Sequence, residues 1–306
     1  MKKSFTAPYM IRSISEWHQL FDLPKPLHPL ISVVDVSLLN HRNAEVWKHY
    51  AQDFYSIALK VGHNCKLIYG QKDYDFNEGS MQFNEPGQVF KILETNNNPV
   101  SGSVLLFKSD LVRNYPLGKI IREYGFFSYA LSEALHLSDS EKAIVLSLMQ
   151  QIQNELKCNI DNFSQDIIVS HIELLLNYAN RFYNRQFITR KTDNNNLLSK
   201  LDELLTFLLN DDQLSITGIP TVQAIAQELN VSPNYLSDML RMLTGLTTQQ
   251  HIHGKLIERA KVLLTTTPLS VSEIAYRLGF EYPQSFNKLF KNKTSVSPSA
   301  FRHSFN

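Results

Sequence analysis

The spacing of apolar and polar residues is of the β type in the first part of the chain and helical later. Between about residues 30 and 108, apolar and aromatic residues stand in short runs, separated by turn clusters such as Asn-Glu-Pro-Gly at 84–87. The runs cover residues 31–36, 54–61, 66–69, 81–83, 89–93 and 103–107. Many short strands at close spacing predict a small barrel or a sandwich.

From about residue 138 the apolar period becomes that of an α-helix. Ser138-x-x-Glu141 is a capping box, and it opens a first helix with the apolar stripe Ile144, Val145, Leu148, Met149, Ile152 and Leu156. A second helix is predicted over about 164–184, with the stripe Ile167, Ile168, His171, Leu174, Leu175, Tyr178 and Phe182. Helices with wide apolar faces must bury them, either on the β-rich part or against another copy of the chain.

A polar segment at residues 189–196 contains Asp193 and three consecutive asparagines, and it predicts an exposed linker. The chain is then multidomain. Residues 1–188 form an N-terminal α+β domain, β-rich over 25–110 and helical over 138–184. Residues 197–306 form a C-terminal all-α domain.

The C-terminal part contains an internal repeat. Val222, Ile225, Ala226 and Leu229 recur 49 residues later as Val271, Ile274, Ala275 and Leu278. Leu236, Leu240 and Thr244 recur 50 residues later as Phe286, Phe290 and Thr294. Two copies with the same core positions predict two similar units, at residues 221–243 and 270–293.

Each copy has the features of a helix-turn-helix. A small alanine, Ala226 or Ala275, stands where two helices must approach closely, and Asn230 or Gly279 tolerates the positive φ of a tight turn. A proline follows at the first position of the second helix, where its missing N–H costs nothing. These features predict two units that place a helix in the major groove of DNA.

The second helix of each copy begins differently. Ser232, ahead of Pro233, is a good N-cap, whereas Tyr282, ahead of Pro283, is a poor one. Between the copies, a helix over about 248–264 would fix their separation, so that they could enter successive major grooves about 34 Å apart.

The C-terminal part resembles the AraC/XylS family of transcription regulators over about residues 201–302. The resemblance rests on 273–280 (Glu-Ile-Ala-Tyr-Arg-Leu-Gly-Phe), on a helix-like run at 257–264, and on Phe286, Phe290, Lys291, Pro298, Phe301 and Arg302. It implies a β-rich, cupin-like barrel as a sensor and two dimerisation helices ahead of the DNA-binding domain. Ser295 stands where the family usually has glycine, which predicts a weaker helix end. Pro283 displaces a more usual polar residue, which predicts fewer base contacts there.

The outward faces of the two second helices are the predicted DNA contacts. In the first unit these residues are Asn234, Tyr235, Ser237, Asp238 and Arg241; in the second they are Gln284, Ser285, Asn287, Lys288 and Lys291. Asparagine and glutamine suit adenine edges, and arginine and lysine suit guanine or phosphate. Asp238 either accepts from a cytosine amino group or orients Arg241. We expect the first unit to supply more of the specificity.

Charge supports this placement. Residues 241–306 hold nine lysines and arginines against three acidic residues, on a chain whose net charge is +1. Positive charge concentrated at one end is expected where a protein meets the phosphates of DNA.

The β-rich part offers a weaker candidate site. Seven aromatic residues could line the interior of a barrel around a small ligand, although filling the core is the favoured role for most of them: Tyr55, Tyr69, Tyr74, Phe76, Phe83, Phe90 and Phe107. The histidines there are dispersed, and Cys65 and Cys158 lack metal spacing, so neither a metal nor a cofactor is expected. The chain shows no P-loop, nucleophile elbow or paired catalytic carboxylate, so an enzyme is not expected.

These patterns together predict a sequence-specific DNA-binding transcription regulator, modulated by a small molecule in the N-terminal domain. The alternative is a constitutive DNA binder whose N-terminal domain only dimerises. The expected partners are double-stranded DNA, a second copy of the chain and a small-molecule effector, with RNA polymerase as a further candidate. Neither a signal peptide nor a membrane span is visible, which predicts a cytoplasmic protein.

Overall fold

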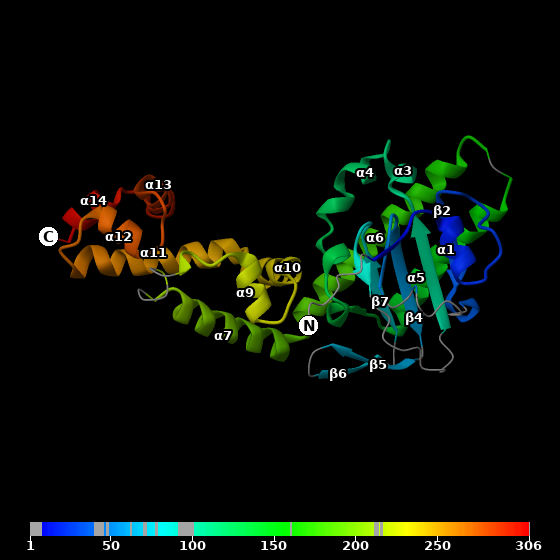
Figure 1. Ribbon diagram of the computed structural model, residues 1–306, viewed down its shortest axis with the longest axis horizontal. Helices are drawn as coiled ribbons and strands as arrows, with labels where there is room; N and C mark the ends of the chain where they lie inside the picture. Colours follow the sequence, from blue (N-terminus) through cyan, green and yellow to red (C-terminus); the bar gives the residue numbers. More distant parts are fainter. Residues whose placement is uncertain are drawn as a thin grey trace, which may run out of the picture. The chain divides into compact units, whose positions relative to one another are not determined.

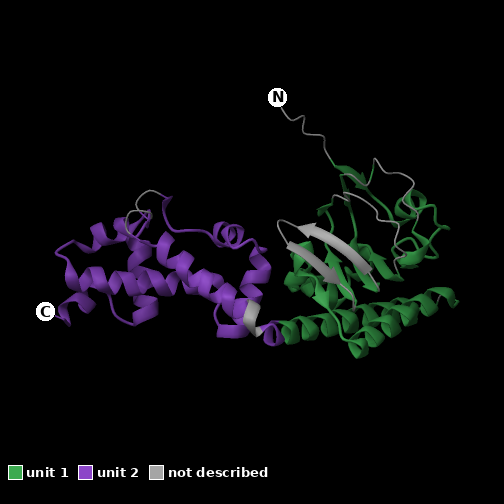
Figure 2. Ribbon diagram, turned by 90° about the horizontal axis from the view of Figure 1, so that it is seen from below, with its two compact units in different colours: residues 1–186 green, residues 187–306 purple. Residues whose placement is uncertain are grey.

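The computed structural model describes residues 8–39, 46, 49–61, 63–69, 72–76, 79–90, 101–159, 161–210, 214 and 217–305, with the backbone alone for 63–69, 72–76 and 191–193. The chain divides into two compact units, Met1–Gln186 (unit 1) and Phe187–Asn306 (unit 2), drawn in separate colours in Figure 2. No helix in these residues is long and apolar enough to cross a membrane.

Unit 1 is built around a five-stranded antiparallel sheet with the order β10-β7-β4-β9-β2. Its strands are β2 (Ile31–Asp35), β4 (Tyr55–Val61), β7 (Ser80–Asn84), β9 (Ser101–Phe107) and β10 (Leu135–His136). A second sheet has three strands in the order β1 (Tyr9–Ile11), β3 (Tyr50–Gln52) and β8 (Val89–Phe90). A third sheet consists of β5 (His63–Tyr69) and β6 (Lys72–Phe76). The α+β class is as predicted. The cupin-like barrel is not confirmed, because the described strands form three separate sheets without closing.

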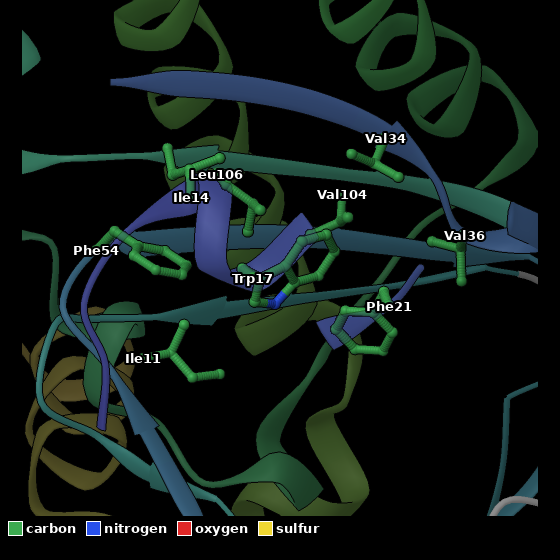
Figure 3. Packing of buried hydrophobic residues seen from close by; sticks show 9 residues of the cluster. All are labelled: Ile11, Ile14, Trp17, Phe21, Val34, Val36, Phe54, Val104 and Leu106. Carbon is green, nitrogen blue, oxygen red and sulfur yellow. The ribbon is translucent and has the colours of Figure 1, made fainter. Parts of the chain in front are cut away.

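One face of the main sheet is covered by α1 (Ile14–Leu20), a short helix that the sequence pattern did not predict. Ser13 caps it, its side chain accepting from the N–H of Glu16 at 3.1 Å. Figure 3 shows Trp17 of α1 among side chains of β2 and β9, including Val34 and Leu106. Because side chains alternate along a strand, the residues on either side of these point to the opposite face.

Helices α5 (Asp139–Lys157) and α6 (Ser164–Thr189) lie against the opposite face, where Val33 and Ser103 border a cleft with α5 and Phe83 meets Tyr183 of α6. The predicted capping box opens α5, and Glu141 also pairs with Arg185 of α6 at 2.5 Å. Between β9 and α5 the chain forms short turns of helix, α3 (Ser109–Val112), α4 (Pro116–Ile120), η2 (Ile121–Glu123), η3 (Gly125–Ser128) and η4 (Leu131–Glu133), and η1 (Val36–Leu38) follows β2.

Unit 2 is helical, and α11 (Thr248–Thr266) is its central element. The other helices are α7 (Lys191–Leu208), α9 (Val222–Glu228), α10 (Pro233–Thr244), α12 (Val271–Arg277), α13 (Pro283–Thr294) and α14 (Pro298–His303). Figure 1 shows α9 and α10 along one end of α11 and α12, α13 and α14 along the other. The predicted stripe of α11, which includes Ile252, Leu256 and Ala260, is buried.

The segment expected to be an exposed linker, 189–196, is mostly helical. α6 continues to Thr189, and α7 begins at Lys191. Asn194 is buried, and its side-chain N–H donates to the carbonyl of Phe187 at 2.6 Å. Polar composition misled the prediction here, because an asparagine amide can be buried once a backbone carbonyl satisfies it. Asn195 and Asn196 are exposed, as expected.

Candidate nucleic-acid interface

The first helices of the two repeats, α9 and α12, each begin with a hydroxyl N-cap and bury the same alanine position. The hydroxyl of Thr221 accepts from the N–H of Ala224 at 3.1 Å, and that of Ser270 accepts from Glu273 at 3.2 Å. The carboxylate of Glu273 in turn accepts from the N–H of Ser270 at 2.7 Å, and this hydrogen bond holds the pKa of the Glu273 carboxyl below its ordinary value. The predicted alanines, Ala226 and Ala275, are fully buried.

The turn of each repeat uses a left-handed residue, as predicted. Asn230 has φ of 56° and Gly279 has φ of 79°. A Cβ on Gly279 would lie 3.1 Å from backbone atoms of Gly218 and Ile219, so this turn also needs glycine for space. The second turn therefore tolerates substitution less than the first.

The second helices, α10 and α13, differ at both ends. Ser232 caps α10 by accepting from the N–H of Tyr235 at 3.3 Å, whereas Tyr282 offers no side-chain cap to α13, as predicted. Gly245 ends α10 with φ of 76°, and Ser295, fifty residues later, ends α13 with φ of 66°. A residue with a Cβ is strained in this conformation, so the structure supports a weaker end for α13.

The predicted face of α13 is open. All five predicted side chains are exposed: Gln284, Ser285, Asn287, Lys288 and Lys291. Phe286 and Phe290 are fully buried on the opposite side. The second helix therefore presents amides and two cations together, a set suited to base edges and phosphates.

The predicted face of α10 is partly covered. Asn234 and Arg241 are exposed, as expected. Tyr235 is only 8% exposed, and its ring lies 5.3 Å from that of Phe187, measured between centroids. Placing Tyr235 toward solvent or DNA was wrong, because the repeat alone did not show that a residue from the end of α6 covers it.

Two further residues of this face are engaged within unit 2. The hydroxyl of Ser237 lies 3.0 Å from that of Thr248, the first residue of α11, and Ser237 is half-buried. Asp238 accepts from Arg241 at 3.1 Å, an ion pair one helical turn apart. Of the two roles left open for Asp238, the geometry favours orienting Arg241.

Arg302 has a structural role within unit 2. Its Nε–H donates to the carbonyl of Leu264 at 2.9 Å, so it ties α14 to the last turns of α11. A cation at a helix C-terminus is favourable, and the last turn of α11 contains no basic residue of its own. One of the nine basic residues at this end of the chain is therefore used for packing.

The aromatic candidates of unit 1 divide into three sets. Tyr55 and Phe107 stack with ring centroids 5.1 Å apart, and Phe83 lies 4.6 Å from Phe126, so these residues fill the core. Burial raises the pKa of the Tyr55 hydroxyl. Phe90 contacts Tyr50 at 5.3 Å, and the burial of Tyr50 raises its pKa to about 12. The side chains of Tyr69, Tyr74 and Phe76 lie outside the described residues.

Unit 1 also has a cleft between the sheet and α5. Its volume is about 470 Å³, and it is lined by Val33, Asp35, Ser103, Leu146, Ser147, Met149, Gln150 and Gln153. Across the described part of the chain, His, Cys, Asp and Glu side chains form no group of three suited to a metal ion.

Comparisons with known proteins match the C-terminal part. Residues 225–304 match a family described as a helix-turn-helix domain. The HTH-type transcriptional activator RhaR of Salmonella dublin is 34% identical over 103 residues, which are 34% of this chain and 35% of that protein. Histidine kinase P4 of Formosa agariphila is 31% identical over 111 residues, which are 35% of this chain and 8% of that protein.

A solved structure matches the same share of the chain. The C-terminal domain of the two-component response regulator yesN from Fusobacterium nucleatum is 30% identical, with a TM-score of 0.31, over 35% of this chain and 98% of that domain. The match to RhaR spans about a third of that relative's length. The matches to RhaR and to histidine kinase P4 each cover about a third of this chain.

Proposed function

We propose that the chain is a transcription regulator of the AraC/XylS family that binds specific DNA sequences, which the helix-turn-helix match and the similarity to RhaR support. The observation that carries this proposal is the pair of helix-turn-helix units along α11, each with a polar face on its second helix. A rigid helix between two such faces suits two successive major grooves on one side of the duplex.

Selection of bound sequences from random DNA by the full chain tests this proposal. We expect two short conserved blocks about one helical turn, or about 10 base pairs, apart. Enrichment of a single block would contradict the use of both units. Equal affinity for selected and random DNA would contradict sequence-specific binding altogether.

The second part of the proposal is a small-molecule effector bound in unit 1. The packed rings of Tyr55, Phe83 and Phe107 make the aromatic core a poor site, which favours the cleft against α5. Its volume is within the range of ligand sites, and Asp35, Ser103 and Gln150 offer hydrogen bonds to a neutral polar compound. A ligand there would contact both the sheet and α5.

A screen of metabolites by thermal stability tests the effector, with Gln150→Trp filling the cleft and Gln151→Trp as the control from outside its lining. We expect a stabilising compound to lose its effect in Gln150→Trp alone. Stabilisation that survives Gln150→Trp would place the effector elsewhere. The absence of any stabilising compound would favour a constitutive DNA binder with a dimerising N-terminal unit, an alternative that the packed aromatic core also supports.

The third part of the proposal is a homodimer formed through α6. Ile167 and Leu174 are 41% and 44% exposed, and the half-buried His171 and Tyr178 continue the same stripe at helical spacing. Apolar residues repeating every three and four positions are the pattern of a helix that pairs with another helix.

Sedimentation of the full chain tests the dimer. We expect Leu174→Glu to shift the protein to a monomer, and Leu38→Glu, a matched change at another exposed leucine of unit 1, to leave it dimeric. A wild-type chain that sediments as a monomer at high concentration would exclude a dimer through α6.

A further inference from the structure

Three residues in contact connect the junction of α6 and α7 to α10, and we call them the joint: Phe187, Asn194 and Tyr235. All three belong to unit 2, and Phe187 and Asn194 are 2% and 3% exposed. Asn194, in the first turns of α7, donates to the carbonyl of Phe187 near the end of α6. The ring of Phe187 then contacts the ring of Tyr235 at 69° between the planes. Two helices are thus linked to α10 through one phenylalanine.

The bond from Asn194 has a clear physical role. The last carbonyls of a helix have no partner within the helix, and a buried carbonyl must find one elsewhere. The amide of Asn194 donates to the carbonyl of Phe187 and so links the end of α6 to the start of α7. The neighbours Asn195 and Asn196 are exposed, so only one asparagine of the three occupies this position.

The ring contact between Phe187 and Tyr235 lies at the part of α10 that is expected to meet DNA. Tyr235 lies in the first turn of α10, between the exposed Asn234 and the half-buried Ser237. In helix-turn-helix proteins the N-terminal residues of the second helix contact base edges. An edge-to-face ring contact has a preferred geometry, so it restrains how this turn is rotated about the axis of α10.

We propose that Phe187 is a positioning residue for the first recognition helix, α10. Its ring, held in place by Asn194, orients the first turn of α10 and so controls how the first unit reads its half of the DNA site. Because α6 begins in unit 1 and ends in unit 2, this makes the end of α6 part of the DNA-reading apparatus. The inference rests on the proposed DNA binding.

Gel shifts with the full chain test the role of Phe187 on the sequence selected by the wild type. The block read by α10 is identified as the one in which Arg241→Ala loses its preference at one base position. We expect Phe187→Ala to weaken binding to the intact site about tenfold, the loss from one misplaced base contact. Scrambling the α10 block should then lower the DNA affinity of Phe187→Ala less than it lowers that of the wild type. Scrambling the α13 block should lower the DNA affinity of both proteins equally.

Matched controls separate positioning from general damage. Ile188→Ala, a change at a 46% exposed neighbour on α6, should bind like the wild type. Phe187→Leu, which keeps apolar bulk at the joint, should recover part of the discrimination at the α10 block. A Phe187→Ala protein that loses affinity equally through both blocks, or that keeps full discrimination at the α10 block, would overturn the proposal.

The asparagine run supplies a second test that holds even where Phe187→Ala does not fold. Asn194→Ala removes the bond to the Phe187 carbonyl and should weaken discrimination at the α10 block selectively, whereas Asn196→Ala should leave both blocks unchanged. If Asn194→Ala and Asn196→Ala changed discrimination at the α10 block equally, the proposed role of the Asn194–Phe187 hydrogen bond would be refuted. A wild type that selects no DNA sequence would instead refute the proposed function, so the two failures are distinguishable.

Discussion

The two helix-turn-helix units use the same core but differ in how their second helices are held. α10 has a serine cap at its start and a glycine at its end, and its face is partly covered by Phe187 and by the bond to Thr248. α13 has neither cap nor terminal glycine, and its predicted face is fully exposed. The repeat therefore determines the scaffold, while contacts from outside the repeat determine which side chains are exposed on it.

The largest difference should appear at the turns. Gly279→Ala should destabilise unit 2 by about 2 kcal/mol, because alanine disfavours positive φ and its Cβ would meet the backbone of Gly218. Asn230→Ala, at the equivalent position, should cost only about 1 kcal/mol, since asparagine already carries a Cβ there. Denaturant unfolding measures both; equal losses would show that the close approach at Gly279 has no cost.

At the recognition faces, Arg241→Ala should cost about 1–3 kcal/mol of specific DNA binding and relax the preference at one base position. We expect the ion pair with Asp238 to orient the guanidinium, so Asp238→Asn should weaken the same preference to a smaller degree. Gel shifts on single-base variants of the selected site measure the effect. Unchanged affinity of Arg241→Ala would remove this residue from the interface.

On the second face, Lys291→Ala should act without regard to sequence if Lys291 contacts a phosphate. We expect selected and random DNA to be weakened alike, and the slope of log affinity against log salt to fall by about one. Titrations at several salt concentrations measure the slope. A loss confined to the selected site would instead assign Lys291 to a base.

The smallest expected effect is a gain in stability at the end of α13. Ser295→Gly should stabilise the protein by about 0.5–1 kcal/mol, because glycine adopts φ of 66° without the penalty of a Cβ. Gly245→Ser, the reverse change at the end of α10, should destabilise it by a similar amount. Thermal unfolding measures the stability change of each variant. A destabilised Ser295→Gly protein would contradict this explanation of how α13 ends.

Local features could be predicted wherever the interacting residues lie close in the sequence. The capping boxes at Ser138 and Ser270, the left-handed turn residues and the poor cap at Tyr282 each depend on positions within a few residues. Helix α1 escaped prediction because its seven residues are too short for a clear helical period, and its stability comes from packing on the sheet. The arrangement of the strands as three sheets depends on pairings between distant segments, which short apolar runs do not specify.

The β-rich part, the two long helices and the repeated helix-turn-helix follow from the amino-acid sequence alone, because periodicity and caps act over a few residues. Which of the predicted DNA-facing residues are exposed depends instead on tertiary packing. Tyr235 is buried, and its ring contacts that of Phe187, which lies 48 positions earlier. Ser237 lies within hydrogen-bond distance of Thr248 at the start of the next helix. Such contacts depend on how whole helices pack, and helical spacing carries no information about a partner that arrives from elsewhere in the chain.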